Sequence, residues 1–156
     1  TLNARTSGGS ISASQRAGTL EIGTSGGSIH IEGASGEMLK ATTSGGSIRL
    51  SGVTAPAEIH TSGGSINVEA SGAPLNASTS GGGIDATFTA APTGDIVLKT
   101  SAGSIGVALP PSAAFQLDAS TSAGGVRSDF PVTVTKSAWR SMPWAAFSIW
   151  LSTIRT

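Results

Sequence analysis

Apolar and polar residues alternate in short segments on both sides of a Thr-Ser corner that recurs along the chain. In one repeat, residues 39–41 lead into the corner at Thr43 as Leu-Lys-Ala, and residues 48–50 leave it as Ile-Arg-Leu. A period of two is typical of a β-strand with one buried and one solvated face. The pattern therefore predicts two short strands in each repeat, joined at the corner.

The corner reads Thr-Ser-(Gly/Ala)-Gly-(Ser/Gly)-(Ile/Val) and occurs seven times. The repeats begin at Thr6, Thr24, Thr43, Thr61, Thr79, Thr100 and Thr121. The intervals of 18, 19, 18, 18, 21 and 21 residues are too short for independent domains, so each repeat should be one coil of a stacked array. We predict an all-β fold, a single-stack parallel β-solenoid (β-helix) with two short strands per turn. A right-handed coil is the default for parallel crossovers.

Glycine marks both corners of the predicted coil. The second glycine of the motif never varies among the repeats, so we expect it to need a positive φ. These structural corner glycines are Gly9, Gly27, Gly46, Gly64, Gly82, Gly103 and Gly124. The first glycine becomes Ala102 and Ala123 in the last two repeats, which indicates that it needs only small bulk. A looser second corner, where prolines cluster and loop length varies, should carry Gly18, Gly36, Gly52, Gly72 and Gly94.

The repeat pattern predicts a solenoid over residues 1–135 and a different segment over residues 136–156. All three Trp lie in the second segment, which lacks the glycine pattern. Three interpretations are open: a cap on the end of the solenoid, an exposed interaction patch, or an atypical, truncated end. Ile149, Leu151 and Thr153 restore the strand spacing and suggest one more strand, whereas Arg140 and Pro143 argue against a membrane span.

Composition narrows the classes of partner. Nine Lys and Arg balance nine Asp and Glu, so no basic field is available to hold nucleic acid. The chain has no Cys, which excludes disulfides and thiolate metal sites. No signal peptide is recognisable in this segment, and Thr1 begins in the middle of the strand pattern, as expected of a piece of a longer protein.

Candidate catalytic chemistry is sparse. His30 and His60 fall in different outward columns with no carboxylate at a metal-ligand spacing, and the glycine-rich corner lacks the Lys of a phosphate loop. We expect no catalytic residue, no metal and no cofactor. The candidate site is instead an outward ladder of hydroxyls from Ser7, Ser25, Ser44, Ser62, Ser80, Ser101 and Ser122. The motif threonines should form a neighbouring hydroxyl ladder. The structural alternative is that the hydroxyls of the corner cap its backbone groups.

The corner at residues 43–48 and a late block resemble a known family. The block comprises Leu-Pro-Pro at 109–111, Phe-Gln-Leu-Asp-Ala-Ser-Thr at 115–121 and Ser-Asp-Phe-Pro at 128–131. Over roughly residues 2–134 the chain is similar to a bacterial adhesin domain family, formerly described only as a domain of unknown function. The resemblance implies a β-solenoid with an adhesive or cell-envelope role and brings no catalytic residues. Residues 137–147 depart from the family pattern, which continues with a glycine-rich loop and a Thr-x-x-Gly turn.

The expected function is a non-enzymatic domain of the bacterial cell envelope or exterior that contacts glycan, cell wall or a protein weakly and multivalently. One alternative is a structural spacer that self-assembles through an open solenoid edge. Ice binding would require the Thr column to face outward, whereas the alternation places Thr in phase with buried Leu and Ile. A β-helical polysaccharide lyase would need clustered charges, but Lys40, Arg49 and Arg127 are dispersed.

Overall fold

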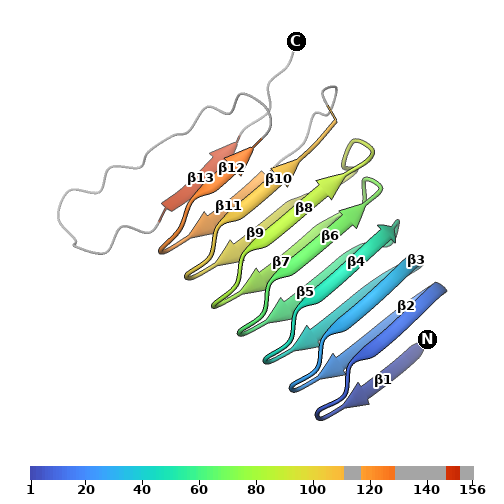
Figure 1. Ribbon diagram of the computed structural model, residues 1–156. Helices are drawn as coiled ribbons and strands as arrows, with labels where there is room; N and C mark the ends of the chain where they lie inside the picture. Colours follow the sequence, from blue (N-terminus) through green and yellow to red (C-terminus); the bar gives the residue numbers. More distant parts are fainter. Residues whose placement is uncertain (111–116, 129–146, 152–156) are drawn as a thin grey trace.

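The computed structural model describes residues 1–110, 117–128 and 147–151, and every regular element in these ranges is a β-strand of one 13-stranded sheet (Figure 1). The strands are β1 (Leu2–Thr6), β2 (Ile11–Thr24), β3 (Ile29–Thr43), β4 (Ile48–Val53), β5 (Ala57–Thr61), β6 (Ile66–Ala70), β7 (Leu75–Thr79), β8 (Ile84–Phe88), β9 (Ile96–Thr100), β10 (Ile105–Ala108), β11 (Leu117–Thr121), β12 (Val126–Ser128) and β13 (Phe147–Leu151).

The sheet is wound into a β-solenoid, because the strands from β1 to β12 pair in parallel with the equivalent strands of the neighbouring coils. Thr43 lies opposite Thr61, and Thr61 opposite Thr79, so the sequence repeat is also the structural register. Two faces result. The post-corner face comprises Ile11–Ser14, Ile29–Glu32, β4, β6, β8, β10 and β12; the pre-corner face comprises β1, Leu20–Thr24, Leu39–Thr43, β5, β7, β9, β11 and β13. The predicted parallel solenoid is confirmed.

A single aliphatic core lies between the two faces. On the post-corner face, isoleucines one coil apart stack on one another with exposed fractions of 0–1% at Ile29, Ile48, Ile66, Ile84 and Ile105. On the pre-corner face, large and small side chains exchange places between coils: Leu39 and Ala41 are followed by Ala57 and Ile59. These two coils therefore fill a similar volume, and aliphatic side chains alone pack these positions.

The second corner differs along the stack. In β2 and β3 the strand continues around it, with one register shift between Ala17 and Thr19, whereas from β4 onward the strands break there. Residues 14–19 and 32–38 contain no proline, but the later second corners contain Pro56 and Pro74. Proline lacks the N–H that a ladder needs, so the prediction of two separate strands per coil holds for the later coils and is wrong for β2 and β3.

The strand suggested near the carboxyl end exists, but it runs in the opposite direction to the coils. β13 pairs antiparallel with β11, with Leu151 opposite Leu117 and Phe147 opposite Thr121. Residues 129–146 and 152–156 lie outside the described ranges, so the choice among cap, patch and atypical end stays a prediction. Among the residues that the structure describes, no helix is long and apolar enough to cross a membrane.

Candidate functional site

The motif threonines hold each tight corner to the coil before it. Thr61 Oγ1 donates a 3.0 Å hydrogen bond to the carbonyl oxygen of Gly46 and accepts one of 3.3 Å from the amide of Gly64. The donated bond recurs with lengths of 2.8–3.0 Å at Thr24, Thr43, Thr79, Thr100 and Thr121. These hydroxyls therefore cap backbone groups that would otherwise be buried without a partner.

The six motif threonines from Thr24 to Thr121 are buried, with exposed fractions of 0–7%. Their alternation in phase with Leu and Ile predicted this orientation, and the expectation of a Thr ladder beside the outward serines was wrong. They form no outward hydroxyl column beside the serines, so the structure removes the array that an ice-binding function would need.

The invariant corner glycines are required for a different physical reason from the predicted one. Among the described residues, positive φ occurs at Gln15 and at Gly18, Gly33, Gly36, Gly52 and Gly72. The expectation of positive φ was therefore wrong for Gly9, Gly27, Gly46, Gly64, Gly82, Gly103 and Gly124. A Cβ on any of these from Gly27 onward would lie only 1.9–2.1 Å from the carbonyl oxygen of the equivalent glycine one coil earlier. Close approach of two backbones, and not φ, requires glycine here.

The first glycine of the pair is less constrained. A Cβ on Gly63 would lie 3.5 Å from the carbonyl oxygen of Ser44, and one on Gly45 would lie 3.7 Å from that of Ser25. Both are ordinary contacts, so the prediction that only small bulk is needed is confirmed. This spacing explains Ala102 and Ala123 at the equivalent positions.

The seven candidate serines lie together on the outer edge of the tight corner. We call this set the serine column: Ser7, Ser25, Ser44, Ser62, Ser80, Ser101 and Ser122, all exposed. Their backbones stack through bonds such as that from the Gly63 amide to the Ser44 carbonyl, at 2.9 Å. No hydroxyl of the column bonds to another residue in the described part of the chain, because the threonines do the capping. Serines of the column in neighbouring coils lie one strand separation apart, about 4.8 Å.

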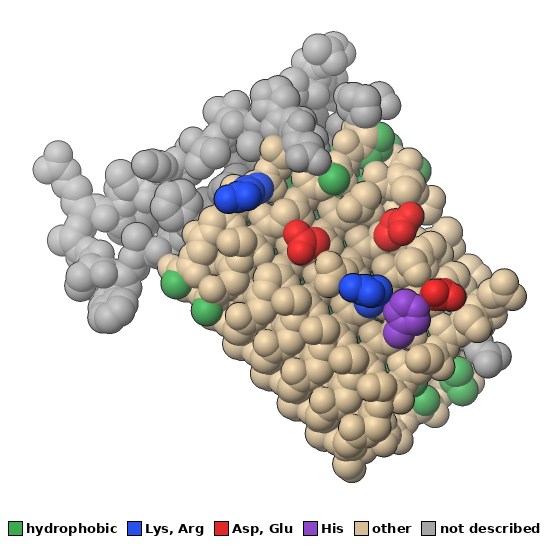
Figure 2. Space-filling model, viewed as in Figure 1, with side chains coloured by type: hydrophobic (Ala, Val, Ile, Leu, Met, Phe, Trp, Pro, Cys, Tyr) green, Lys and Arg blue, Asp and Glu red, His purple; other side chains and the backbone are tan. Residues whose placement is uncertain are grey.

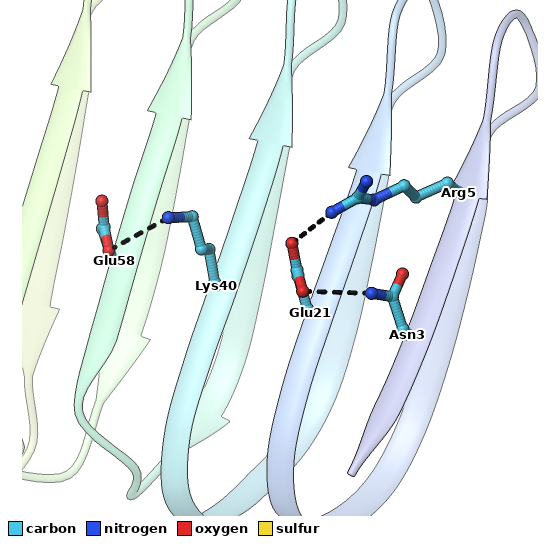
Figure 3. A network of polar contacts seen from close by, with 5 residues as sticks. All are labelled: Asn3, Arg5, Glu21, Lys40 and Glu58. Carbon is cyan, nitrogen blue, oxygen red and sulfur yellow. Dashed lines mark hydrogen bonds and ion pairs between the residues drawn. The ribbon is translucent and has the colours of Figure 1, made fainter.

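Charged side chains on the amino-terminal half of the pre-corner face pair from coil to coil (Figure 3). Glu21 accepts a 3.0 Å hydrogen bond from Asn3 and forms an ion pair with Arg5. Lys40 Nζ lies 3.6 Å from Glu58 Oε2. Each exposed pair contributes at most about 1 kcal/mol to the free energy of unfolding. The main effect of this network is therefore to neutralise the charge of the surface.

The post-corner face carries few charges, and they are scattered over a mainly neutral polar surface (Figure 2). One outward column runs through Ser12, His30, Arg49, Asn67, Asp85, Gly106 and Arg127. Arg49, Asp85 and Arg127 have no hydrogen-bond or ion-pair partner among the residues that the structure describes.

The two histidines lie on opposite faces. His30 Nε2 is 3.1 Å from Glu32 Oε1 on the same strand, so it has a carboxylate neighbour that sequence reasoning did not assign. His60 Nδ1 is 2.8 Å from Ser78 Oγ. Within the described ranges, no group of three or more His, Cys, Asp or Glu side chains could hold a metal ion.

A hollow of about 200 Å³ interrupts the post-corner face, and sequence reasoning missed it. Asp85, Gly106 and Arg127 line it, together with Thr87 and Ala108. The sequence feature that could have indicated the hollow is Gly106. Gly106 stands in an outward column where the four preceding coils carry His30, Arg49, Asn67 and Asp85.

A family model described as Toastrack DUF4097 matches residues 1–143 of the chain. The match spans all seven Thr-Ser corners and most of the sequence. Comparisons with curated proteins and with solved structures give no match. The repeat solenoid that the resemblance implied is supported, while its adhesive role stays a prediction.

Proposed function

The chain belongs to the Toastrack DUF4097 family, and from that premise we propose that it is a non-enzymatic solenoid domain that holds an extended partner through the serine column. The partner class is a glycan of the cell surface or cell wall. The serine column carries the proposal, because its hydroxyls are exposed, unbonded to other described residues and repeated in every coil.

Regular spacing favours a polymeric partner over a small molecule. A single hydrogen bond contributes a net of about 0.5–1.5 kcal/mol, which is too little for stable binding by itself. A partner that contacts several coils at once gains avidity, because each further contact is made at high effective concentration. A glycan offers repeated hydroxyls that can both donate to and accept from serine.

The non-enzymatic assignment is part of the proposal. An activated serine nucleophile needs a base within hydrogen-bond reach. The two histidines instead contact Glu32 and Ser78, neither of which belongs to the serine column. Location at the bacterial cell envelope or exterior is likewise proposed, and fractionation of cells that express the full-length protein tests it.

Capture of purified cell-wall and extracellular glycans by the folded chain tests the proposed function. We expect the double substitution Ser44→Lys with Ser80→Lys to reduce capture at least roughly tenfold, because two bulky side chains interrupt the array. The matched control, Ser14→Lys with Asn76→Lys, adds the same charge at exposed positions outside the column and should bind like wild type. Equal capture by both variants, or no capture by folded wild type, would refute the proposal.

A structural spacer that self-assembles is the second candidate function. Neighbouring coils from β1 to β12 are joined through parallel backbone ladders, and the same pairing can join the end coils of two copies. An open edge can pair with another strand. Light scattering over a range of protein concentrations distinguishes the candidates, since a spacer of this kind lengthens with concentration in the absence of glycan.

A further inference from the structure

The hollow at Gly106 is bounded by opposite charges. Asp85 lies on β8 and Arg127 on β12, with β10 and its Gly106 between them. A Cβ on Gly106 would lie 2.6 Å from Asp85 Oδ1, so the carboxylate reaches over the glycine toward the hollow. No ion pair joins Asp85 to Arg127 or to any other described residue. A carboxylate and a guanidinium therefore face a shared space without neutralising each other.

We propose that this hollow binds one acidic sugar unit, a pyranose ring that carries a carboxylate. The Arg127 guanidinium donates two parallel hydrogen bonds to the ligand carboxylate. The Asp85 carboxylate accepts hydrogen bonds from ring hydroxyls, and the Thr87 hydroxyl is exposed at the rim. Because β10 carries only glycine at this register, no β10 side chain separates the ring from the Asp85 carboxylate, which itself lies over Gly106.

Size and separation favour this ligand over others. A hollow of about 200 Å³ is smaller than the 300–1,000 Å³ of typical drug-sized sites, so it accommodates a single ring. Strands β8 and β12 are two strand spacings apart, about 9.6 Å. A ring with its carboxylate on one side and hydroxyls on the other bridges such a gap better than a compact amino acid, whose opposite charges lie close together.

The location connects this site to the proposed glycan contact, on which the choice of a sugar rests. In their own coils, Ser80, Ser101 and Ser122 each lie five residues before Asp85, Gly106 and Arg127. A polymer along the serine column can thus place one acidic unit in the hollow. The interaction should weaken with salt, because both charged groups are exposed.

Titration of the full 156-residue chain with methyl glucuronoside, followed by NMR, tests the site. We expect the Gly106 amide and the Arg127 side chain to shift, and methyl glucoside, which lacks the carboxylate, to bind at least roughly tenfold more weakly. Gly106→Asn fills the hollow and should abolish the shifts. It should fold, because the added Cβ would clash only with the far end of the flexible Asp85 side chain, which can turn aside, and Asn67 occupies the equivalent position on the other side of Asp85.

Asp85→Asn and Arg127→Gln should each weaken binding, whereas Arg49→Gln, in the same column but outside the hollow, should not. Unchanged binding by Gly106→Asn, or equal binding of glycine or inorganic phosphate, would overturn the acidic-sugar site. Glycan capture that depends on the serine column while methyl glucuronoside gives no shift refutes this inference alone. Methyl glucuronoside binding without any glycan capture refutes the proposed function and leaves the hollow as a small-ligand site.

Discussion

The tight corner and the second corner both depend on glycine, and the physical reasons differ between Gly64 and Gly52. At the tight corner, Gly64 packs its backbone against Gly46, and a Cβ would lie 2.0 Å from the Gly46 carbonyl oxygen. At the second corner, Gly52 has a φ of 62° and ordinary contacts of 3.7–3.8 Å to Gly33. Gly64 must be glycine because of the neighbouring coil, and Gly52 because of its own backbone conformation.

This difference explains where the solenoid is regular and where it varies. A corner that must match the coil above and below it cannot change in one coil alone, so all seven tight corners keep their length. The second corner can adopt several local conformations, and the intervals lengthen from 18 to 21 residues there. The serine column is displayed by the constrained corner, which gives it an even spacing.

The largest expected effect is that of a methyl group at the tight corner. Gly64→Ala should lower the free energy of unfolding by about 4 kcal/mol or more, because the coils must separate to admit the Cβ. Thermal and denaturant unfolding measure the loss. Gly63→Ala is the matched control one residue earlier and should change stability by less than about 1 kcal/mol.

Gly9→Ala is a second control at the same motif position. A Cβ there meets only Thr6, at 3.5 Å or more, because the described structure has no earlier coil against it. In this 156-residue chain the substitution should be tolerated. If Gly9→Ala were as damaging as Gly64→Ala, the cause would lie in the corner itself and not in coil stacking.

Loss of the hydrogen bonds made by a motif threonine hydroxyl, here called the threonine clamp, should have the next largest effect on stability. Thr61→Val preserves shape but loses the bond to the Gly46 carbonyl and leaves the Gly64 amide without its partner, at a cost of about 1–3 kcal/mol. Denaturant unfolding is the measurement. Thr61→Ser keeps the hydroxyl and should recover part of the stability. Equal free energies of unfolding for Thr61→Val and Thr61→Ser would argue against the threonine clamp.

A smaller effect is expected at the second corner. Gly52→Ala should cost about 1–2 kcal/mol, which is the strain of a left-handed backbone. Gly52→Asn should cost less, because Asn adopts this region more readily. Gly64→Asn should show no such relief, since the obstacle there is steric. Unfolding of all three variants separates the two uses of glycine, and relief by Asn at both positions would contradict the distinction.

The smallest effect on stability belongs to the serine column. Ser62→Ala should change the free energy of unfolding by no more than about 0.5 kcal/mol, because the side chain is exposed and its hydroxyl bonds to no other described residue. Glycan capture by the same variant should fall measurably. A large loss of stability would mean that the hydroxyl has a structural role.

Much of the fold could be predicted from local pattern. The alternation around Thr61 and the constant intervals indicated strands, coils and register, and the structure places Thr61 opposite Thr43 as the repeat predicts. The outward direction of the serine column followed from the same alternation. The φ of Gly64 could not be predicted, because an invariant glycine can be required either by a positive φ or by the close approach of another backbone.

The sequence by itself determined the periodic features: the β-solenoid, its inward aliphatic columns and the exposed serines, because side-chain direction alternates strictly along a strand. Only the tertiary structure decided features that depend on distances between coils. These include the backbone contact at Gly64, the continuation of β2 and β3 around the second corner, the reversed direction of β13 and the hollow between Asp85 and Arg127. Residues roughly 20 apart in sequence become neighbours there, and local pattern carries no measure of how closely they approach.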